Sequence, residues 1–168
     1  MPREDIKLTE IPLEPPHSKQ SLRLWLRLLN TTTFIEKSIR SYFAQAFDTT
    51  LPRFDVLAAL DRHPDGLTMG ELSEHLLVSN GNVTGLVSRL QEDGMVLRTA
   101  SKDDRRTYRV RLTRKGQQAF HEMATAHESF VDGMLSGLND KDLGKLTTLL
   151  ERLQKSAAEA AQKKDKDA

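Results

Sequence analysis

One short segment near the middle of the chain does most to constrain the fold. Thr68 and Glu71 have the Thr-x-x-Glu spacing of a capping box, which predicts that a helix begins near Met69. This helix is expected to end near Leu77, and Ser79 is a favourable N-cap for another helix. Because only about three residues separate the two helices, the segment predicts a helix-turn-helix.

The second helix of this motif has two chemically different faces. Val83, Leu86, Val87 and Leu90 recur at helical spacing and are expected to point inward, and Gly94 follows at the C′ position. The other face carries small or hydrogen-bonding side chains, which suit the base edges of a DNA major groove. The candidate DNA contacts on this helix are Ser79, Asn80, Gly81, Asn82, Thr84, Ser88 and Arg89.

Two glycines on the same face bear on this interpretation. Gly81 and Gly85 each cost a helix up to about 1 kcal/mol relative to alanine. Their lack of bulk would let the helix lie deep in a groove. The competing interpretation is that they mark a weak, solvated helix. A hairpin that follows directly in the sequence favours the first interpretation.

That hairpin is predicted from two strand-like segments, residues 95–100 and 107–113, with residues 102–106 as the tip. A hairpin directly after a helix-turn-helix is a wing. The second strand alternates an apolar set with a polar set, which predicts one half-buried face and one exposed face: Tyr108, Val110 and Leu112 against Thr107, Arg109 and Arg111.

Positive charge is concentrated in this part of the chain. Residues 79–116 carry nine basic and four acidic side chains, although the whole protein has a net charge of only +1. The flanking segments, residues 51–78 and 117–150, each carry two basic and five acidic side chains. A local basic patch on a nearly neutral protein favours a site for a polyanion, with a solvated charged face as the alternative.

The wing supplies candidate contacts of three kinds. An arginine at a hairpin tip can enter the narrow minor groove, and a preceding carboxylate can orient the guanidinium through a charge-assisted hydrogen bond. Arginines on the exposed face of the second strand suit phosphates. The candidate wing residues are Asp104 and Arg105 with Arg106 at the tip, and Arg109 and Arg111 on the strand.

The expected fold class is mainly α with a small β-hairpin wing, in which a winged helix-turn-helix joins a helical dimerisation region. The apolar stripes at residues 22–47 and 143–157 are too long for one winged domain of about 70 residues to bury, which predicts a homodimer. The expected parts are a disordered arm at 1–17, the dimerisation region at 18–48 and 117–160, the DNA-binding domain at 49–116, and a disordered tail at 161–168.

Several classes of protein are disfavoured. The chain has no cysteine, which excludes disulfides and cysteine-based zinc sites, and no combination of residues suggests nucleophilic catalysis. No apolar run approaches the length of about 20 residues that a membrane span needs. We therefore expect a cytoplasmic protein that is not an enzyme and has no metal, cofactor or membrane partner.

A small-molecule site is a further expectation. Most of the aromatic and basic side chains that would suit an aromatic acid or an acyl-CoA lie on the first long helix. The alternative for each of them is a core or solvated position. The candidates are Trp25, Arg27, Phe34, Arg40, Tyr42, Phe43, Arg53 and Phe54.

The order of long helix, short helix, helix-turn-helix, wing and two closing helices resembles the MarR family of winged-helix transcriptional regulators. The stretches that carry the resemblance are "LPRFDVLAAL", "LTMGELSEHLLVSNGNVTGLVSRLQEDGMVLR" and "DDRRTYRVRLTRKG", within residues 20–155. The resemblance implies an obligate homodimer, a ligand cleft between the dimer region and the DNA-binding lobe, and entry of Arg106 into the minor groove.

The segment "SNGNVTGLVSRL" looks like members of that family that control aromatic-acid catabolism, including those that respond to hydroxycinnamoyl-CoA thioesters. The resemblance thus implies a repressor that an aromatic acid or its CoA thioester releases from a pseudo-palindromic DNA operator. Two alternatives remain open: a winged-helix module that binds protein, and a DNA-binding regulator without an effector.

Overall fold

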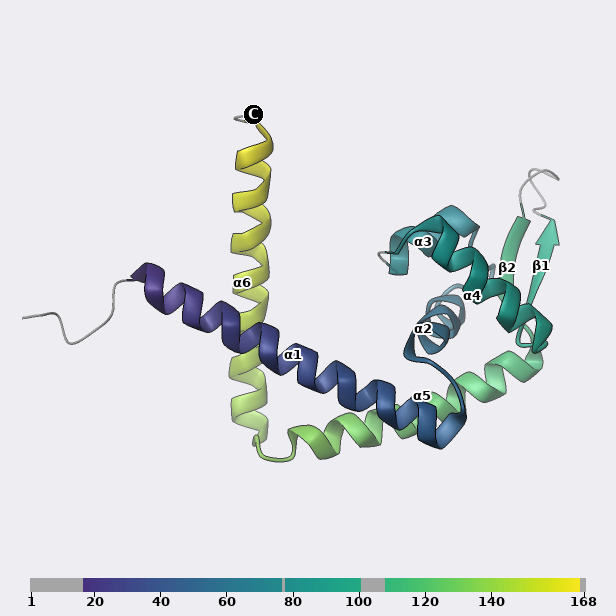
Figure 1. Cartoon of the computed structure of the whole chain (residues 1–168), viewed down its shortest axis with the longest axis horizontal. Helices are drawn as coiled ribbons and strands as arrows, with labels where there is room; N and C mark the ends of the chain where they lie inside the picture. The colour runs from purple at the N-terminus through teal and green to yellow at the C-terminus, as the bar shows by residue number, and fades with distance from the viewer. Residues whose placement is uncertain (1–16, 77, 101–107, 167–168) are drawn as a thin grey trace, which may run out of the picture. The chain divides into compact units, whose positions relative to one another are not determined.

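The computed structural model describes residues 17–76, 78–100 and 108–166, and it divides the chain into two compact units. The first unit, Met1–Leu51, contains α1 (His17–Phe47), and the second, Pro52–Ala168, contains almost all the rest (Figure 1). The expected class, mainly α with one β-hairpin, is confirmed. The other elements are α2 (Leu51–Asp61), α3 (Met69–Leu76), α4 (Asn80–Glu92), β1 (Val96–Ala100), β2 (Tyr108–Leu112), α5 (Arg114–Leu135) and α6 (Asp140–Lys166).

Helix α1 forms as its uninterrupted helical pattern predicts, since neither glycine nor proline occurs within it. Near its C-terminal end, the ring of Tyr42 lies 6.1 Å from the rings of both Phe43 and Phe47. Asp48 ends the helix with a φ of 47°. The expected disordered arm falls at residues 1–16 outside the described residues, whereas His17 is already helical.

The core of the second unit joins α2, α3, α4 and the hairpin. Its innermost side chains come from the apolar positions of each element, and burial of each contributes about 1.5–3 kcal/mol. The helix-turn-helix is therefore confirmed. Three of the four predicted inner residues of α4 are buried, whereas the fourth, Leu86, is only half-buried. The side chains exposed by no more than 2% are Val56, Leu57, Leu60, Leu72, Val83, Val87, Leu90, Val96 and Val110.

The hairpin is antiparallel, with Val96 opposite Leu112 and Ala100 opposite Tyr108. Val110 is fully buried, but Tyr108 is 58% exposed, so the burial expected for the apolar set of this strand does not extend to Tyr108. Alternation along a strand sets the side to which a residue points, but not whether the core reaches that far. Tyr108 lies at the end of the ladder that is farther from α5.

The start of α5 is packed tightly against the turn after α4. The Thr113 hydroxyl accepts a hydrogen bond from Gly116 N at 3.0 Å, and it lies 2.7 Å from the Gly94 carbonyl oxygen, to which it donates. Gly116 is buried directly against the Met95 carbonyl. The Thr-x-x-Gly sequence thus provides both a cap and a close approach of two backbones.

Helix α6 begins after Asn139, whose side-chain oxygen accepts a hydrogen bond from Asp142 N at 3.0 Å, as in an asparagine N-cap. The helix continues to Lys166, so the expectation of a disordered tail from residue 161 is wrong as far as residue 166. Alanine, glutamine and lysine are good helix formers, and no proline or glycine ends the helix earlier.

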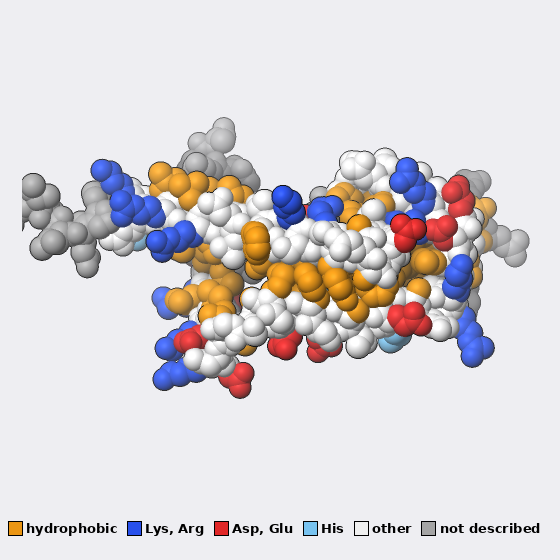
Figure 2. Space-filling model, turned by 60° about the horizontal axis from the view of Figure 1, so that its bottom comes forward, with side chains coloured by type: hydrophobic (Ala, Val, Ile, Leu, Met, Phe, Trp, Pro, Cys, Tyr) orange, Lys and Arg blue, Asp and Glu red, His pale blue; other side chains and the backbone are white. Residues whose placement is uncertain are grey.

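Exposed apolar side chains line both long helices. On α1, Leu22 and Trp25 are 57% and 56% exposed, and on α6 Leu146 and Leu150 are 43% and 42% exposed. Figure 2 shows hydrophobic side chains, in orange, on the surface of the molecule. A single chain therefore leaves the two predicted stripes partly open to solvent.

The two helix caps of the winged domain predict contrasting effects of mutation. Thr113→Ala removes a hydroxyl that caps α5 and binds the Gly94 carbonyl, so the free energy of unfolding is expected to fall by about 1–2 kcal/mol. Ser79→Ala is expected to change it by less than about 0.5 kcal/mol, because the Ser79 side chain makes no capping hydrogen bond. Urea denaturation of both variants checks this pair, and equal losses would contradict it.

Candidate nucleic-acid interface

The outer face of α4 presents the residues predicted to contact bases. Val83, Val87 and Leu90 are buried and hold the helix against the domain. Of the seven predicted contact residues, Ser88 is half-buried and the others are exposed, namely Ser79, Asn80, Gly81, Asn82, Thr84 and Arg89. The structure thus gathers all seven on the outside of one helix or at its N-cap.

The N-terminal half of α4 is lightly held. Ser79 occupies the predicted N-cap position with an extended backbone, but its side chain makes no capping hydrogen bond. The Thr84 hydroxyl donates to the Asn80 carbonyl oxygen at 2.8 Å, one turn back along the helix. A Cβ added at Gly81 or Gly85 would meet nothing within 4 Å. These glycines therefore leave open space outside the helix and serve no internal packing.

The C-terminal end of α4 is firmly fixed. Asp93 forms an ion pair with Arg53 of α2, and its carbonyl oxygen accepts a hydrogen bond from Lys115 Nζ of α5 at 2.8 Å. Gly94 follows with a φ of 69°, and Met95 N donates to the Leu90 carbonyl oxygen at 2.9 Å. The predicted glycine C′ position is confirmed, while the ion pair had no recognisable signal in the sequence.

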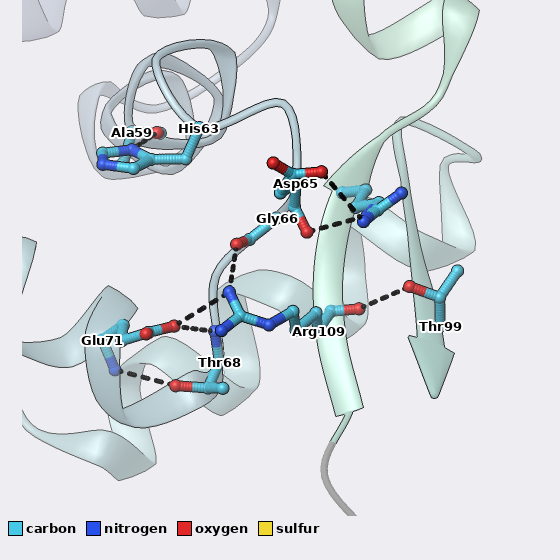
Figure 3. Close-up of polar contacts among 9 residues, drawn as sticks. Ala59, His63, Asp65, Gly66, Thr68, Glu71, Thr99 and Arg109 are labelled. Carbon is cyan, nitrogen blue, oxygen red and sulfur yellow. Dashed lines mark hydrogen bonds and ion pairs between the residues drawn. The ribbon is translucent and has the colours of Figure 1, made fainter. Parts of the chain in front are cut away.

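At the base of the wing, the two predicted phosphate-binding arginines bind the protein itself. Arg109 Nη1 donates to the Gly66 carbonyl oxygen at 2.7 Å and lies 3.6 Å from a carboxylate oxygen of Glu71 (Figure 3). Arg111 Nε donates to the Asp65 carbonyl oxygen at 2.9 Å. From the sequence, Pro64-Asp65-Gly66 predicts only the end of a helix, so these partners were not foreseen.

Glu71 also closes the capping box that the sequence predicted. Thr68 N donates to Glu71 Oε2 at 2.7 Å, and Glu71 N donates to Thr68 Oγ1 at 3.2 Å. The backbone N–H of Thr68 holds the pKa of the Glu71 carboxyl below its ordinary value, with a smaller contribution from Arg109. Glu71 is therefore a carboxylate that both starts α3 and faces the wing.

The wing tip, with the candidate contacts Asp104, Arg105 and Arg106, lies outside the described residues. Their proposed roles, including the entry of Arg106 into a minor groove, remain predictions.

The predicted ligand residues occupy several different environments. Trp25, Arg27, Phe34 and Arg40 are exposed on α1, and Arg40 pairs with Glu36 one turn away at 2.5 Å. Tyr42 and Phe43 belong to the ring cluster at the end of that helix. In the second unit, Arg53 pairs with Asp93, and Phe54 is buried with its ring 5.6 Å from Phe120.

A groove of about 370 Å³ lies against α4. Its walls combine an apolar surface from Pro52, Val78 and Leu86 with the side chains of Asn82 and Arg89. Gly81 and Gly85 complete the lining, so the groove shares residues with the predicted DNA-binding face. None of the eight predicted ligand residues lines it, and no sequence pattern indicates it.

Two other features are absent from the residues with defined placement. Among them, no group of three or more histidine, aspartate or glutamate side chains is placed to hold a metal ion. In the same part of the chain, no helix is long and apolar enough to cross a membrane.

The winged helix-turn-helix, with an exposed hydrogen-bonding helix followed by a basic hairpin, defines a DNA-binding transcription regulator. The chain belongs to the MarR family: the family's sequence model matches residues 47–107. It is 31% identical over 133 residues to an uncharacterised helix-turn-helix transcriptional regulator of Bacillus cereus. The aligned residues make up 77% of this chain and 87% of the relative.

Other similar proteins agree with this assignment. The crystal structure of a MarR family transcriptional regulator from Silicibacter pomeroyi has a TM-score of 0.73 and 33% identity, and covers 86% of this chain and 99% of that chain. The transcriptional activatory protein BadR of Rhodopseudomonas palustris is 32% identical over 61% of this chain and 59% of its own length. The transcriptional repressor IacR of Pseudomonas putida is 29% identical over 62% of each chain.

Proposed function

We propose that this regulator binds a specific DNA sequence by placing α4 in the major groove. The observation that carries the proposal is the outer face of α4, where asparagine, arginine and glycine residues are exposed on the side opposite the buried Val83, Val87 and Leu90. Asparagine can pair bidentately with adenine, and arginine with guanine. On the described part of the wing, Arg109 and Arg111 add positive charge to the hairpin that follows this helix in the sequence.

We further propose that the protein acts as a homodimer. The exposed apolar side chains of α1 and α6, among them Trp25 and Leu150, would lose their contact with water against a second copy. A two-fold symmetric dimer places its two recognition helices about 34–36 Å apart, one turn of DNA. Its operator would then be a pseudo-palindrome with half-sites at that spacing.

The proposed effector is a small aromatic acid or its CoA thioester, and the proposed mode is repression. The groove beside α4 supports an aromatic acid because it combines apolar walls with the cation of Arg89. A ligand there would occupy residues that DNA also needs, so its binding would release the operator. The name of IacR supports repression, whereas that of BadR shows that a relative of similar identity activates transcription.

Substitution of Gly85 by alanine is expected to have opposite effects on DNA binding by α4 and on the stability of the protein. Because an added Cβ meets nothing within 4 Å, Gly85→Ala is expected to raise the free energy of unfolding by about 0.5–1 kcal/mol. The same methyl group would hold the helix away from the groove, so affinity for DNA is expected to fall about tenfold or more. Urea denaturation and fluorescence anisotropy measure the two effects, with a duplex that the protein selects from a randomised pool.

Gly133→Ala is the matched control, because Gly133 lies within α5 and an added Cβ there also meets nothing within 4 Å. This variant is expected to gain similar stability and to keep the affinity of the wild type. A Gly85→Ala protein that is more stable and binds the duplex normally would show that α4 does not lie deep in a groove.

A further inference from the structure

Strand β2 holds the loop before α3 through alternating backbone and side-chain hydrogen bonds. Val110 N donates to the Leu67 carbonyl oxygen at 2.7 Å, and Leu67 N donates to the Val110 carbonyl oxygen at 3.1 Å. On either side of Val110, the side chains of Arg109 and Arg111 bind the next two carbonyl oxygens, those of Gly66 and Asp65. Three consecutive residues of the strand thus bind three consecutive residues of the loop.

The backbone conformation of the loop explains why side chains, and not the backbone of β2, bind the carbonyl oxygens of Gly66 and Asp65. Gly66 has a φ of 81°, and a Cβ at this position would lie 2.5 Å from the Val110 carbonyl oxygen. The Leu67–Val110 pair is an isolated bridge, so the backbone ladder does not continue to Gly66. The backbone ladder does not reach the carbonyl oxygens of Gly66 and Asp65. The guanidinium groups of Arg109 and Arg111 donate hydrogen bonds to these two oxygens instead.

The clamped loop leads directly into the helix-turn-helix. Thr68 follows Leu67 and caps α3, and Glu71 of the capping box lies beside the Arg109 guanidinium (Figure 3). The ion pair itself is part-exposed and 3.6 Å long, so it contributes little. The hydrogen bonds from the charged guanidinium groups to the carbonyl oxygens therefore contribute most of the side-chain interaction between β2 and the loop.

We infer that Arg109 and Arg111 are positioning residues that fix the wing to the start of α3, and that they do not act as phosphate ligands. The inference rests on the proposed function, since it assigns these residues a role in DNA binding through the placement of the wing. Their side chains are only about one-third exposed, at 34% for Arg109 and 37% for Arg111. Loss of either side chain frees a backbone carbonyl of the loop and loosens the wing.

The test is Arg109→Met, which keeps an aliphatic chain of similar length and removes the donors. In the free protein, the amides of Leu67 and Val110 are expected to exchange with solvent about tenfold faster, as measured by NMR hydrogen exchange. Affinity for the selected duplex is expected to fall about tenfold while the slope of log K against log salt stays at the wild-type value. A lost phosphate contact would instead lower that slope by about 0.9 for each contact.

Arg98→Met is the control, because Arg98 is an exposed arginine on β1 opposite Val110 and its loss removes one charge from the same hairpin. It should leave both amides protected. Unchanged exchange in Arg109→Met, or a reduced salt slope, would overturn the inference. If the wild type binds no duplex, the proposed function fails, whereas amide exchange in the free protein still decides whether Arg109 holds the loop.

Discussion

Gly116→Ala is expected to lower the free energy of unfolding by about 3 kcal/mol. The added Cβ would lie 2.0 Å from the Met95 carbonyl oxygen and 2.9 Å from the carbonyl carbon, where backbone and not a movable side chain is in the way. The same oxygen accepts a hydrogen bond from Thr113 N at 2.9 Å, so displacement of Met95 also weakens that bond. Urea denaturation monitored by circular dichroism measures the loss.

Gly133→Ala again provides the comparison, since it adds the same methyl group to the same helix where nothing lies within 4 Å. The free energy of unfolding should therefore fall in Gly116→Ala and rise in Gly133→Ala. Similar stabilities would mean that α5 can shift away from Met95 at little cost, and the close approach would then have no structural importance.

Leu150→Arg is expected to convert the proposed dimer to monomers. Leu150 is 42% exposed on α6 in the single chain and lies on the stripe that we assign to the dimer interface. A guanidinium group there would be buried without a partner, which is strongly unfavourable. Because two linked sites bind far more tightly than one, affinity for the selected duplex is expected to fall by about 100-fold or more.

Light scattering after size-exclusion chromatography gives the mass, and anisotropy gives the affinity. Thr148→Arg carries the same side chain two residues earlier, about 200° around the helix, and should remain dimeric. If Leu150→Arg stays dimeric and binds normally, this face of α6 is not the interface.

Local sequence patterns predicted the elements of the winged domain well. The capping box of Thr68 and Glu71 is present with both reciprocal hydrogen bonds, and Gly94 adopts the positive φ expected of it. Such patterns succeed because the groups involved lie within four residues of one another, so tertiary packing does not decide them. The buried face of α4 was predictable for a similar reason, since helical spacing fixes which residues share a face.

The failures concern partners that are distant in sequence. Arg109 and Arg111 have the alternation of an exposed strand face, yet they bind carbonyl oxygens 43 and 46 residues earlier in the chain. Arg53 pairs with Asp93 across a separation of 40 residues. A pattern in one segment shows that a side chain is polar and which way it points, but the acceptor that it meets depends on the fold.

The predicted ligand residues remain a prediction, but two of them have partners that their spacing did not indicate. Aromatic and basic side chains at helical spacing indicated a pocket, whereas Phe54 is packed against Phe120 and Arg53 is committed to an ion pair. The groove beside α4 depends instead on residues that lack any such signal, including Gly81 and Gly85. Concavity arises where side chains are small, which a search for large or charged residues cannot find.

The two ends of α4 differ in how many side-chain contacts restrict their conformation. At Asp93 the helix is joined to both α2 and α5, whereas at Ser79 no side chain caps it, and Gly81 lies in the first turn. We therefore expect the first turn to retain part of its conformational entropy in the free protein, and ordering it costs about 1–2 kcal/mol per residue. A duplex that offers too few partners to these residues cannot compensate for that cost. The incomplete order of the helix would thus itself penalise binding to the wrong sequence.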